Sequence, residues 1–344
     1  MMDTDQHRNA RNYYGKELNG SDDLKTSACC IDTIPAQQKH LLGNISSEIL
    51  DRFYGCGSPL PSAIEGLTVL DLGCGTGRDV YLAAQLVGPK GRVIGVDMTT
   101  EQLDIARKYR DSQAARFGYA EANTEFREAT IEDLAAAGIA DNSIDLVISN
   151  CVINLSPEKD RVFKEIFRVL RPGGELFFAD VFADRRLRPE LADDPVLHGE
   201  CLAGALYEED FRRLLLRQGC PDYRIYDARE LEITDQSLKR ELGGARFHSR
   251  TIRAFKLDGL EDRPEDYGQA VCYRGTVADE PDAFKLDEDH VFEAGKYYPV
   301  CGNTAVMLSE TRLKQHVKVV GDRGGHFGLF VYGETALSAS GDCC

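Results

Sequence analysis

Residues 69–79 read VLDLGCGTGRD, in which a short apolar strand breaks into closely spaced glycines and is followed by an amphipathic helix at residues 80–87. Glycines are required where a chain turns sharply and where a ligand approaches bare backbone. A second apolar run, residues 92–97, ends in Asp97 about 20 residues beyond the loop, the spacing at which a carboxylate meets the hydroxyls of a ribose. These segments predict a nucleotide-binding α/β unit, with Met98 placed to lie against an adenine.

The glycine loop differs from the dinucleotide-binding pattern. Its spacing is G-x-G-x-G, whereas G-x-G-x-x-G would require a glycine at Arg78. Asp71, just before the loop, would repel a pyrophosphate but suits the cationic amino-acid end of S-adenosylmethionine (SAM). The turn at Ile131 and Glu132 offers an acceptor to an adenine amino group. Together with LRPGGEL at residues 170–176, these features strongly resemble those of class I SAM-dependent methyltransferases.

Apolar strands alternate with helical segments between residues 67 and 181. The predicted strands are Thr68–Leu72, Arg92–Asp97, Thr124–Glu128, Ile144–Asn150 and Glu175–Val181. Apolar residues at helical spacing lie between them, at residues 101–117 and 159–170. The alternation predicts a parallel sheet with right-handed crossovers. The resemblance implies that this α/β fold is the Rossmann-like sheet of a class I SAM methyltransferase.

The later part of the chain predicts additions to this sheet. After a helix at residues 208–218, two β-rich runs at 222–233 and 246–257 are expected to form an antiparallel edge pair. Residues 183–207 then form a helical substrate-binding insertion above the active site. The predicted domains are an N-terminal capping segment at 1–45, a SAM-binding methyltransferase domain at 46–258 and a small β-rich C-terminal domain at 261–344 that ends in a Cys-Cys tail.

The composition of the 344-residue chain excludes several classes of protein. Its 42% of hydrophobic residues provide a core, and its net charge of −16 opposes a sequence-independent grip on nucleic acid, so a small substrate is expected. The amino terminus lacks the apolar centre of a signal peptide, and no run approaches the roughly 18 apolar residues of a membrane span. A cytoplasmic protein is therefore predicted. In that compartment eleven cysteines do not indicate a disulfide scaffold, and their spacing gives no zinc pattern.

Four cysteines from separate segments carry the substrate prediction. They are Cys29, Cys56, Cys151 and Cys201. Cys151 follows a strand, at the edge where open α/β sheets bind ligands. The surrounding sequences are TSAC at 26–29, YGCG at 54–57, NCVINL at 150–155 and GECLAGAL at 199–206. They look like the four cysteine sites of arsenite SAM methyltransferases, and the likeness covers residues 12–258.

The resemblance implies methyl transfer from SAM to thiol-bound trivalent arsenic, in arsenite and methylarsenite, for detoxification. Cys29, Cys151 and Cys201 would bind arsenic, because thiolates are soft ligands for this thiophilic centre. The lone pair of arsenic can attack the sulfonium methyl without a general base, so catalysis depends on positioning and desolvation. Cys56 and another site cysteine would return electrons to oxidised arsenic, and a dithiol reductant such as thioredoxin or glutathione would reopen their disulfide.

The same resemblance assigns the cofactor site, whereas a monomer is only the default expectation for the assembly. The residues expected to bind SAM are Tyr54, Asp71, Gly73, Cys74, Gly75, Asp97, Met98, Ile131, Glu132 and Asn150. The expected partners are the arsenical thiol adducts and the reductant, and the protein is expected to be a monomer.

Other interpretations of the cysteines remain open. Free cysteine is among the most buried residue types, so any one of these cysteines can be core packing. This interpretation is applied to Cys74, Cys220, Cys272 and Cys301. Only one of the neighbours Cys29 and Cys30 can easily face the site, and the motif favours Cys29. The terminal Cys343 and Cys344 either capture arsenic or have no role.

Two other functions also remain. One is a SAM methyltransferase with a carbon or oxygen acceptor, such as a quinone or sterol. Such an enzyme would require a base near Asn154 and an apolar tunnel for the acceptor. The other is a non-catalytic protein that sequesters arsenic on its thiols. The loop with Asp71, Gly73 and Gly75 weighs against the second, because a sequestering protein would not use a cofactor pocket.

Overall fold

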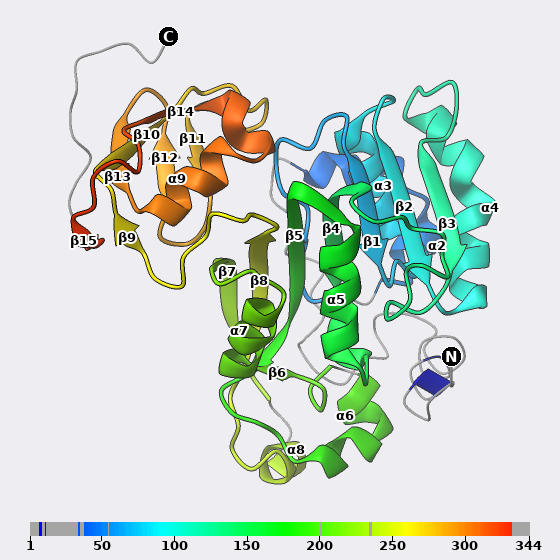
Figure 1. The fold of residues 1–344 in the computed structure, drawn as a ribbon. Coiled ribbons are helices and arrows are strands. Elements are labelled where there is room, and N and C mark those ends of the chain that lie inside the picture. Colours follow the sequence, from blue (N-terminus) through cyan, green and yellow to red (C-terminus); the bar gives the residue numbers. More distant parts are fainter. Residues whose placement is uncertain are drawn as a thin grey trace.

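The fold is a three-layer α/β structure with a set of smaller sheets beside it (Figure 1). The computed structural model describes residues 7–8, 11, 34, 38–53, 55–199, 201–233 and 236–331. Its main sheet has eight strands in the order β3-β2-β1-β4-β5-β8-β7, with β6 paired to β5 outside this path. These strands are β1 (Thr68–Leu72), β2 (Arg92–Asp97), β3 (Thr124–Glu128), β4 (Ile144–Asn150), β5 (Leu170–Ala183), β6 (Leu206–Tyr207), β7 (Tyr223–Leu231) and β8 (Phe247–Phe255).

The sheet topology confirms the prediction. Strands β1 to β5 run parallel, whereas β8 lies antiparallel to β5 and to β7. Strand β5 is longer than predicted, because Leu170 already pairs with Ile144 of β4 before a register shift, and the ladder resumes at Glu175. Parallel strands end at one edge of a sheet, so the loops after β1, β2 and β4 gather there.

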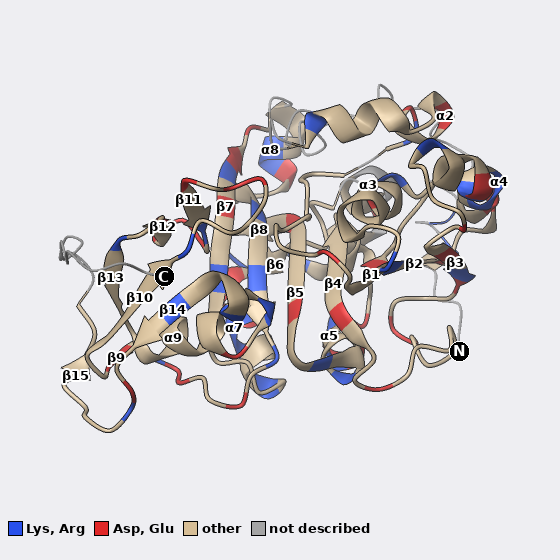
Figure 2. Ribbon diagram, turned by 90° about the horizontal axis from the view of Figure 1, so that it is seen from above, with Lys and Arg blue, Asp and Glu red and all other residues tan. Residues whose placement is uncertain are grey.

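Helices cover both faces of this sheet. They are α3 (Arg78–Val87), α4 (Thr100–Arg116), α5 (Lys159–Val169) and α7 (Glu208–Arg217). Seen from above, α3 and α4 lie on one side of the strands and α5 and α7 on the other (Figure 2). Acidic and basic residues are interspersed along the whole ribbon in this view.

Alternate strand residues supply the two cores. Val69 and Phe177 belong to the buried cluster under α3, whereas their neighbours Leu70 and Phe178 belong to the cluster under α5 and α7. Because successive side chains of a strand point to opposite faces, apolar strands with no polar alternation indicate a sheet covered on both sides. This is why the sequence pattern predicts the sheet so directly.

The segment after β5 packs against the carboxyl edge of the sheet. It contains η6 (Pro189–Asp193) and α6 (Pro195–Gly199), and α8 (Gln236–Glu241) lies near it (Figure 1). A third buried cluster forms here, in which Leu197, Leu202 and Phe247 pack with cysteines from three segments. The helical insertion therefore covers one side of the place where the strands end.

Up to residue 331, the C-terminal part consists of three small sheets, one α-helix and one 3-10 helix beside β7 (Figure 1). Its elements are β9 (Glu265–Asp266), β10 (Gln269–Tyr273), β11 (Ala283–Lys285), β12 (Val291–Glu293), β13 (Tyr297–Val300), α9 (Gly302–Ser309), η7 (Arg312–His316), β14 (Val317–Val320) and β15 (Gly328–Leu329). Its β-rich character confirms the prediction, although α9 was not predicted. Glu175 of β5 pairs with Arg253 at 2.6 Å and with Arg312, so buried charges connect this part to the main sheet.

Only parts of the predicted capping segment are described. A short η4 (Lys39–Asn44) and α2 (Ser47–Leu50) precede β1, and His7 lies in a helical turn. Most of the predicted segment 1–45 lies outside the described residues. Among the helices of the described residues, none has the length and apolar character needed to cross a membrane.

Candidate active site

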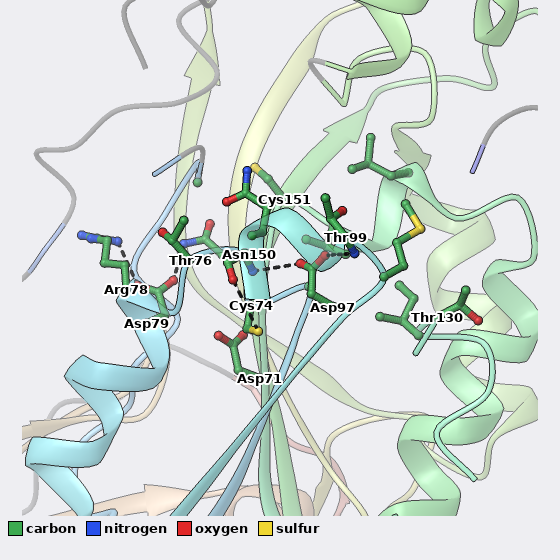
Figure 3. Close-up of a pocket in the computed structure, with 18 of the residues that line it drawn as sticks. Asp71, Cys74, Thr76, Arg78, Asp79, Asp97, Thr99, Thr130, Asn150 and Cys151 are labelled. Carbon is green, nitrogen blue, oxygen red and sulfur yellow. Dashed lines mark hydrogen bonds and ion pairs between the residues drawn. The ribbon is translucent and has the colours of Figure 1, made fainter. Parts of the chain in front are cut away.

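A cavity with about 990 Å³ of empty space, its open mouth included, lies at the carboxyl ends of β1, β2 and β4. Nine of the ten residues predicted to bind SAM line it: Asp71, Gly73, Cys74, Gly75, Asp97, Met98, Ile131, Glu132 and Asn150. Tyr54 lies outside the described residues. Figure 3 shows that the labelled side chains come from the ends of β1, β2 and β4, from the start of α3 and from the loops beside them.

The glycine loop brings backbone groups to the cavity. Gly73 and Gly75 both have left-handed backbone, with φ of 68° and 50°. A Cβ on Gly73 would lie 2.3 Å from the side chain of Val152, so this position has no room for a side chain. The Gly75 N–H donates to Asp97 Oδ2 at 2.9 Å, and the Thr99 N–H donates to Asp97 Oδ1 at 2.8 Å. The Asp97 carboxylate is thus held in place, with lone pairs left for the hydroxyls of a ribose.

Acidic groups give one end of the cavity a preference for cations. Burial raises the pKa of Asp71 well above its usual value, and the nearby charges of Asp79 and Asp97 raise it further. Burial also raises the pKa of Asp97, against the hydrogen bonds from Gly75 and Thr99. A cationic ligand would relieve this mutual repulsion, and the ammonium and sulfonium groups of SAM have the required charge.

A buried acceptor of the cavity has no hydrogen-bond partner among the described residues. Glu132 Oε1 accepts from the Ser156 hydroxyl and lies 3.1 Å from His7 Nε2, whereas Glu132 Oε2 has no such partner. Burial raises the pKa of Glu132, but the hydrogen bonds from His7 and Ser156 outweigh it and the net pKa is lowered. An ionised carboxylate with a free oxygen matches the adenine amino group. His7 was not predicted, since nothing in the sequence connects it to residues so far along the chain.

A buried donor lines the same cavity. Arg78 is 3% exposed, its Nη1 donates to Asp79 Oδ1 at 2.9 Å, and its guanidinium lies 3.6 Å from the centre of the Phe53 ring. Its Nη2 has no hydrogen-bond partner within the part of the chain that the structure describes. A donor of this kind suits the carboxylate of SAM. The acidic cluster, Glu132 and Arg78 therefore fit the charged groups and the adenine of this cofactor.

Asn150 holds the loop that carries Cys56. Its Oδ1 accepts from the N–H groups of Cys56 at 3.0 Å and Gly57 at 3.1 Å, and its Nδ2 donates to Gly57 O and Asp79 Oδ2. A Cβ on Gly55 would lie 2.5 Å from Asn150 Nδ2, and a Cβ on Gly57 would lie 2.5 Å from the Cβ of Ala179 in β5. The two glycines of YGCG therefore allow the Cys56 loop to pack against β4 and β5.

Three of the four predicted cysteines lie together at the edge of the cavity. Cys56 and Cys151 form a disulfide with 5.8 Å between their Cα atoms, and Cys151 lines the cavity. The Cys201 thiol donates to the Cys151 carbonyl at 3.1 Å, and all three residues are buried. Cys29 and Cys30 lie outside the described residues, as do the terminal Cys343 and Cys344.

A buried carboxyl beside the sulfurs was not predicted. An oxygen of Asp180 and the sulfurs of Cys56 and Cys151 all lie within 4.8 Å of one another. Burial raises the pKa of Asp180 to about 7, although backbone N–H groups of Val181 and Asn154 bind the ionised form. The signal in the sequence is an acid in the otherwise apolar strand FFADVFA, residues 177–183. Buried acids are rare, so such an acid indicates a functional position.

The remaining cysteines match their predicted burial, with one correction. Cys74, Cys220 and Cys301 are buried free thiols, as expected for packing. Burial raises the pKa of the Cys220 thiol to about 12, which makes it unreactive. Cys272 was interpreted as a packed thiol, but it is disulfide-bonded. The sequence could not indicate this, because disulfide pairing depends on which cysteines the fold brings together.

Comparisons with known proteins agree with this geometry. A family model described as a methyltransferase domain matches residues 64–219. A protein of Aquipseudomonas alcaligenes named arsenite methyltransferase is 52% identical over 347 residues, which cover 98% of this chain and 100% of that protein. The Homo sapiens protein of the same name is 38% identical over 328 residues, which cover 94% of this chain and 86% of that protein.

A solved structure is similar over most of the chain. The crystal structure of an arsenic(III) SAM methyltransferase from Chlamydomonas reinhardtii superposes on this structure with a TM-score of 0.84. The two sequences are 49% identical, and the match covers 87% of this chain and 100% of the algal chain. Its likeness extends well beyond the sheet that SAM-dependent methyltransferases share. The chain has the class I SAM methyltransferase fold and belongs to the arsenite methyltransferase family.

Proposed function

We propose that this enzyme binds trivalent arsenic, as arsenite or methylarsenite, on its own thiols and transfers methyl groups to it from SAM. The observation that carries this proposal is the meeting of Cys56, Cys151 and Cys201 at the edge of the SAM cavity. A carbon or oxygen acceptor would not require sulfur at this place. A sequestering protein would not require the cavity.

The cofactor is held by groups at both ends of the cavity. Asp97 binds the ribose hydroxyls, and Glu132 accepts a hydrogen bond from the adenine amino group. Asp71 attracts the cationic end, and Arg78 binds the carboxylate. When bound, SAM supplies an electrophilic methyl group. Asp71, Arg78 and Glu132 are buried, so their electrostatic contacts are stronger than they would be in solution.

Arsenic is the substrate and is bound by sulfur. Cys151 and Cys201 are the central ligands, with Cys29 as the third, because three thiolates satisfy a soft trivalent centre and leave its lone pair free. Arsenic carries no proton that must be removed, so no base is needed for methyl transfer. The protein acts by holding the lone pair towards the methyl group.

The Cys56–Cys151 disulfide supports a reducing role for Cys56. Methyl transfer formally oxidises arsenic to the pentavalent state. The Cys56 thiol then attacks the Cys151 sulfur: the arsenic–Cys151 bond breaks, the Cys56–Cys151 bond forms, arsenic regains its electron pair and Cys56 loses its proton. Because Cys151 leaves arsenic in this step, closing the disulfide also weakens the hold on the product. A dithiol such as thioredoxin, or two molecules of the monothiol glutathione, then reopens the disulfide and is itself oxidised to a disulfide.

The reducing step also bears on location and assembly. A cycle that reopens a disulfide at each turn needs a reducing compartment, so we place the enzyme in the cytoplasm. We also propose that it acts as a monomer.

The test is arsenic speciation after incubation of the protein with SAM, arsenite and a dithiol. Chromatography with mass detection should find methylated arsenic with the wild type and none with Cys151→Ser or Cys201→Ser. Cys220→Ser is the matched control, because Cys220 is also a buried free thiol but lies in a different buried cluster, under α7. Absence of methylated arsenic from the wild type, with SAM bound, would favour a carbon or oxygen acceptor.

A further inference from the structure

The two central cysteines have the same unusual backbone conformation. The φ angles of Cys151 and Cys201 are 56° and 62°, in the left-handed region that residues with a Cβ rarely adopt. Among the described residues only Ala63 and Asn142 share this feature outside glycine. A strained conformation persists where surrounding contacts hold it, and such contacts concentrate at functional sites. The two loops must therefore be held by specific neighbours.

Asn154 fastens the first loop to β5. It is 1% exposed, and its backbone N–H donates to Asp180 Oδ2 at 3.1 Å. Its side-chain Nδ2 donates to Asp180 Oδ1 at 2.7 Å and to the Val181 carbonyl at 2.6 Å. These bonds connect the end of the loop that begins at Cys151 to the strand that lies beside the sulfurs. They also fix the Asp180 carboxylate, which lies within 4.8 Å of the Cys151 sulfur.

The same residue sets the position of the second loop. Gly204, three residues after Cys201, packs so closely on Asn154 that a Cβ at this glycine would lie 2.0 Å from the Asn154 carbonyl oxygen. The Lys159 ammonium donates to that oxygen at 3.1 Å and to the Ser156 carbonyl at 2.9 Å. The Asn154 carbonyl therefore cannot move away from Gly204 without disturbing a partly buried, charge-assisted hydrogen bond.

We infer that Asn154 is a positioning residue, which acts with Asp180 and Gly204 to fix the spacing of the Cys151 and Cys201 thiols before arsenic binds. Two ligands that are already at the right spacing bind a shared centre more tightly than two that must be ordered on binding. Asn154 is not among the residues that line the SAM cavity, so its loss should weaken arsenic binding and leave SAM binding unchanged. This inference rests on the proposed function, in which both thiols bind arsenic.

Asn154→Ala removes the amide donors, and Gly204→Ala adds one methyl group against the Asn154 carbonyl. We expect both variants to bind arsenite about tenfold to a hundredfold more weakly after reduction of the protein, with SAM affinity within about twofold of wild type. Equilibrium dialysis with arsenic detection and calorimetry with SAM measure the two affinities. A monosubstituted trivalent arsenical, which takes two thiols, should also bridge Cys151 and Cys201 less completely.

Asn303→Ala is the matched control for stability. Asn303 is also 1% exposed, and its Nδ2 makes two hydrogen bonds of 2.8 Å, to Asp222 Oδ2 and Glu261 O, in the C-terminal part. Its loss should lower the melting temperature while arsenite affinity stays at the wild-type value. Wild-type arsenite affinity in both Asn154→Ala and Gly204→Ala would overturn the inference, and so would an equal loss in Asn303→Ala. If Cys151→Ser and Cys201→Ser bind arsenite normally, the proposed ligands themselves are wrong.

Discussion

Asp71 shows how a single residue links the cavity to the charge of its cofactor. Because its pKa is raised by burial and by the charges of Asp79 and Asp97, Asp71 in the empty site keeps its proton to a higher pH than an ordinary aspartate, whereas a cationic ligand favours the ionised carboxylate. Binding below that pKa must therefore release a proton, and SAM affinity should fall with decreasing pH, by up to about tenfold per unit for one proton. Calorimetry between pH 6 and 8.5 measures this.

Asp71→Asn should bind SAM more weakly at high pH and show a shallower pH dependence, because the remaining slope comes from Asp97, whose pKa is also raised. The uncharged nucleoside methylthioadenosine is the control ligand and should show little dependence on pH. A wild-type SAM affinity that stays constant over this range would contradict the account of the acidic cluster.

A substitution at Arg78 tests the binding of the SAM carboxylate. Arg78→Met keeps the bulk of the side chain but removes the buried Nη2 that has no partner among the described residues. A charged hydrogen bond contributes about 1.5–3 kcal/mol, so SAM affinity should fall about tenfold to a hundredfold. Methylthioadenosine lacks the carboxylate and should bind as it does to wild type. An equal loss for both ligands would show that Arg78 only supports the fold. Arg110→Met, on the exposed surface of α4, is the control.

At the scale of elements, the Cys56 loop depends on its close approach to β5. Gly57→Ala would place a methyl group 2.5 Å from the Ala179 Cβ and push Cys56 away from Cys151. We expect the oxidised protein to contain less Cys56–Cys151 disulfide, which peptide mapping without reductant measures. The rate of repeated turnover should fall about tenfold or more. Gly43→Ala is the control, because nothing lies within 4 Å of a Cβ there. Normal turnover in Gly57→Ala would argue against the reducing role of Cys56.

The elements also show what the sequence could predict and what it could not. The strands of the sheet were predictable because apolar runs such as Leu146–Ile148 are buried on both faces. Asp97 and the glycine loop were predictable because their roles need a fixed spacing along the chain. The partners of Asp180, Arg78 and His7 were not, since each contact depends on the path of a loop. The pairing of Cys56 with Cys151 joins residues that are 95 positions apart.

At the scale of the whole molecule, a buried ion cluster unites the C-terminal part with the main sheet. Glu175 is fully buried, pairs with Arg253 of β8 and with Arg312 of η7, and Arg312 also donates to the carbonyls of Ser62 and Ala63. Glu175→Gln would leave two buried cations without their counter-charge, and a loss of about 3–5 kcal/mol in the free energy of unfolding is expected. Urea unfolding measures this loss.

The order in which the C-terminal part and the main sheet unfold should depend on this cluster. If this cluster holds the C-terminal part, the Glu175→Gln protein should unfold in two steps, with the C-terminal part unfolding first. An exposed ion pair such as Arg92 with Glu125 should contribute less than about 1 kcal/mol to the free energy of unfolding. A single unchanged transition would show that other contacts join the two parts. SAM affinity should remain near that of the wild type, because Glu175 lies outside the lining of the cavity.

In the proposed cycle, arsenic is methylated on thiols that then supply the electrons for its reduction. The most direct measurement is a single-turnover reaction: fully reduced protein, freed of dithiol under anaerobic conditions, is mixed with SAM and arsenite. Methylated arsenic is then quantified together with the alkylation of each cysteine by mass spectrometry. We expect about one methyl group per chain, with the Cys56–Cys151 disulfide appearing in step. Continued turnover without dithiol, or methylation that leaves Cys56 and Cys151 free for alkylation, would contradict the account.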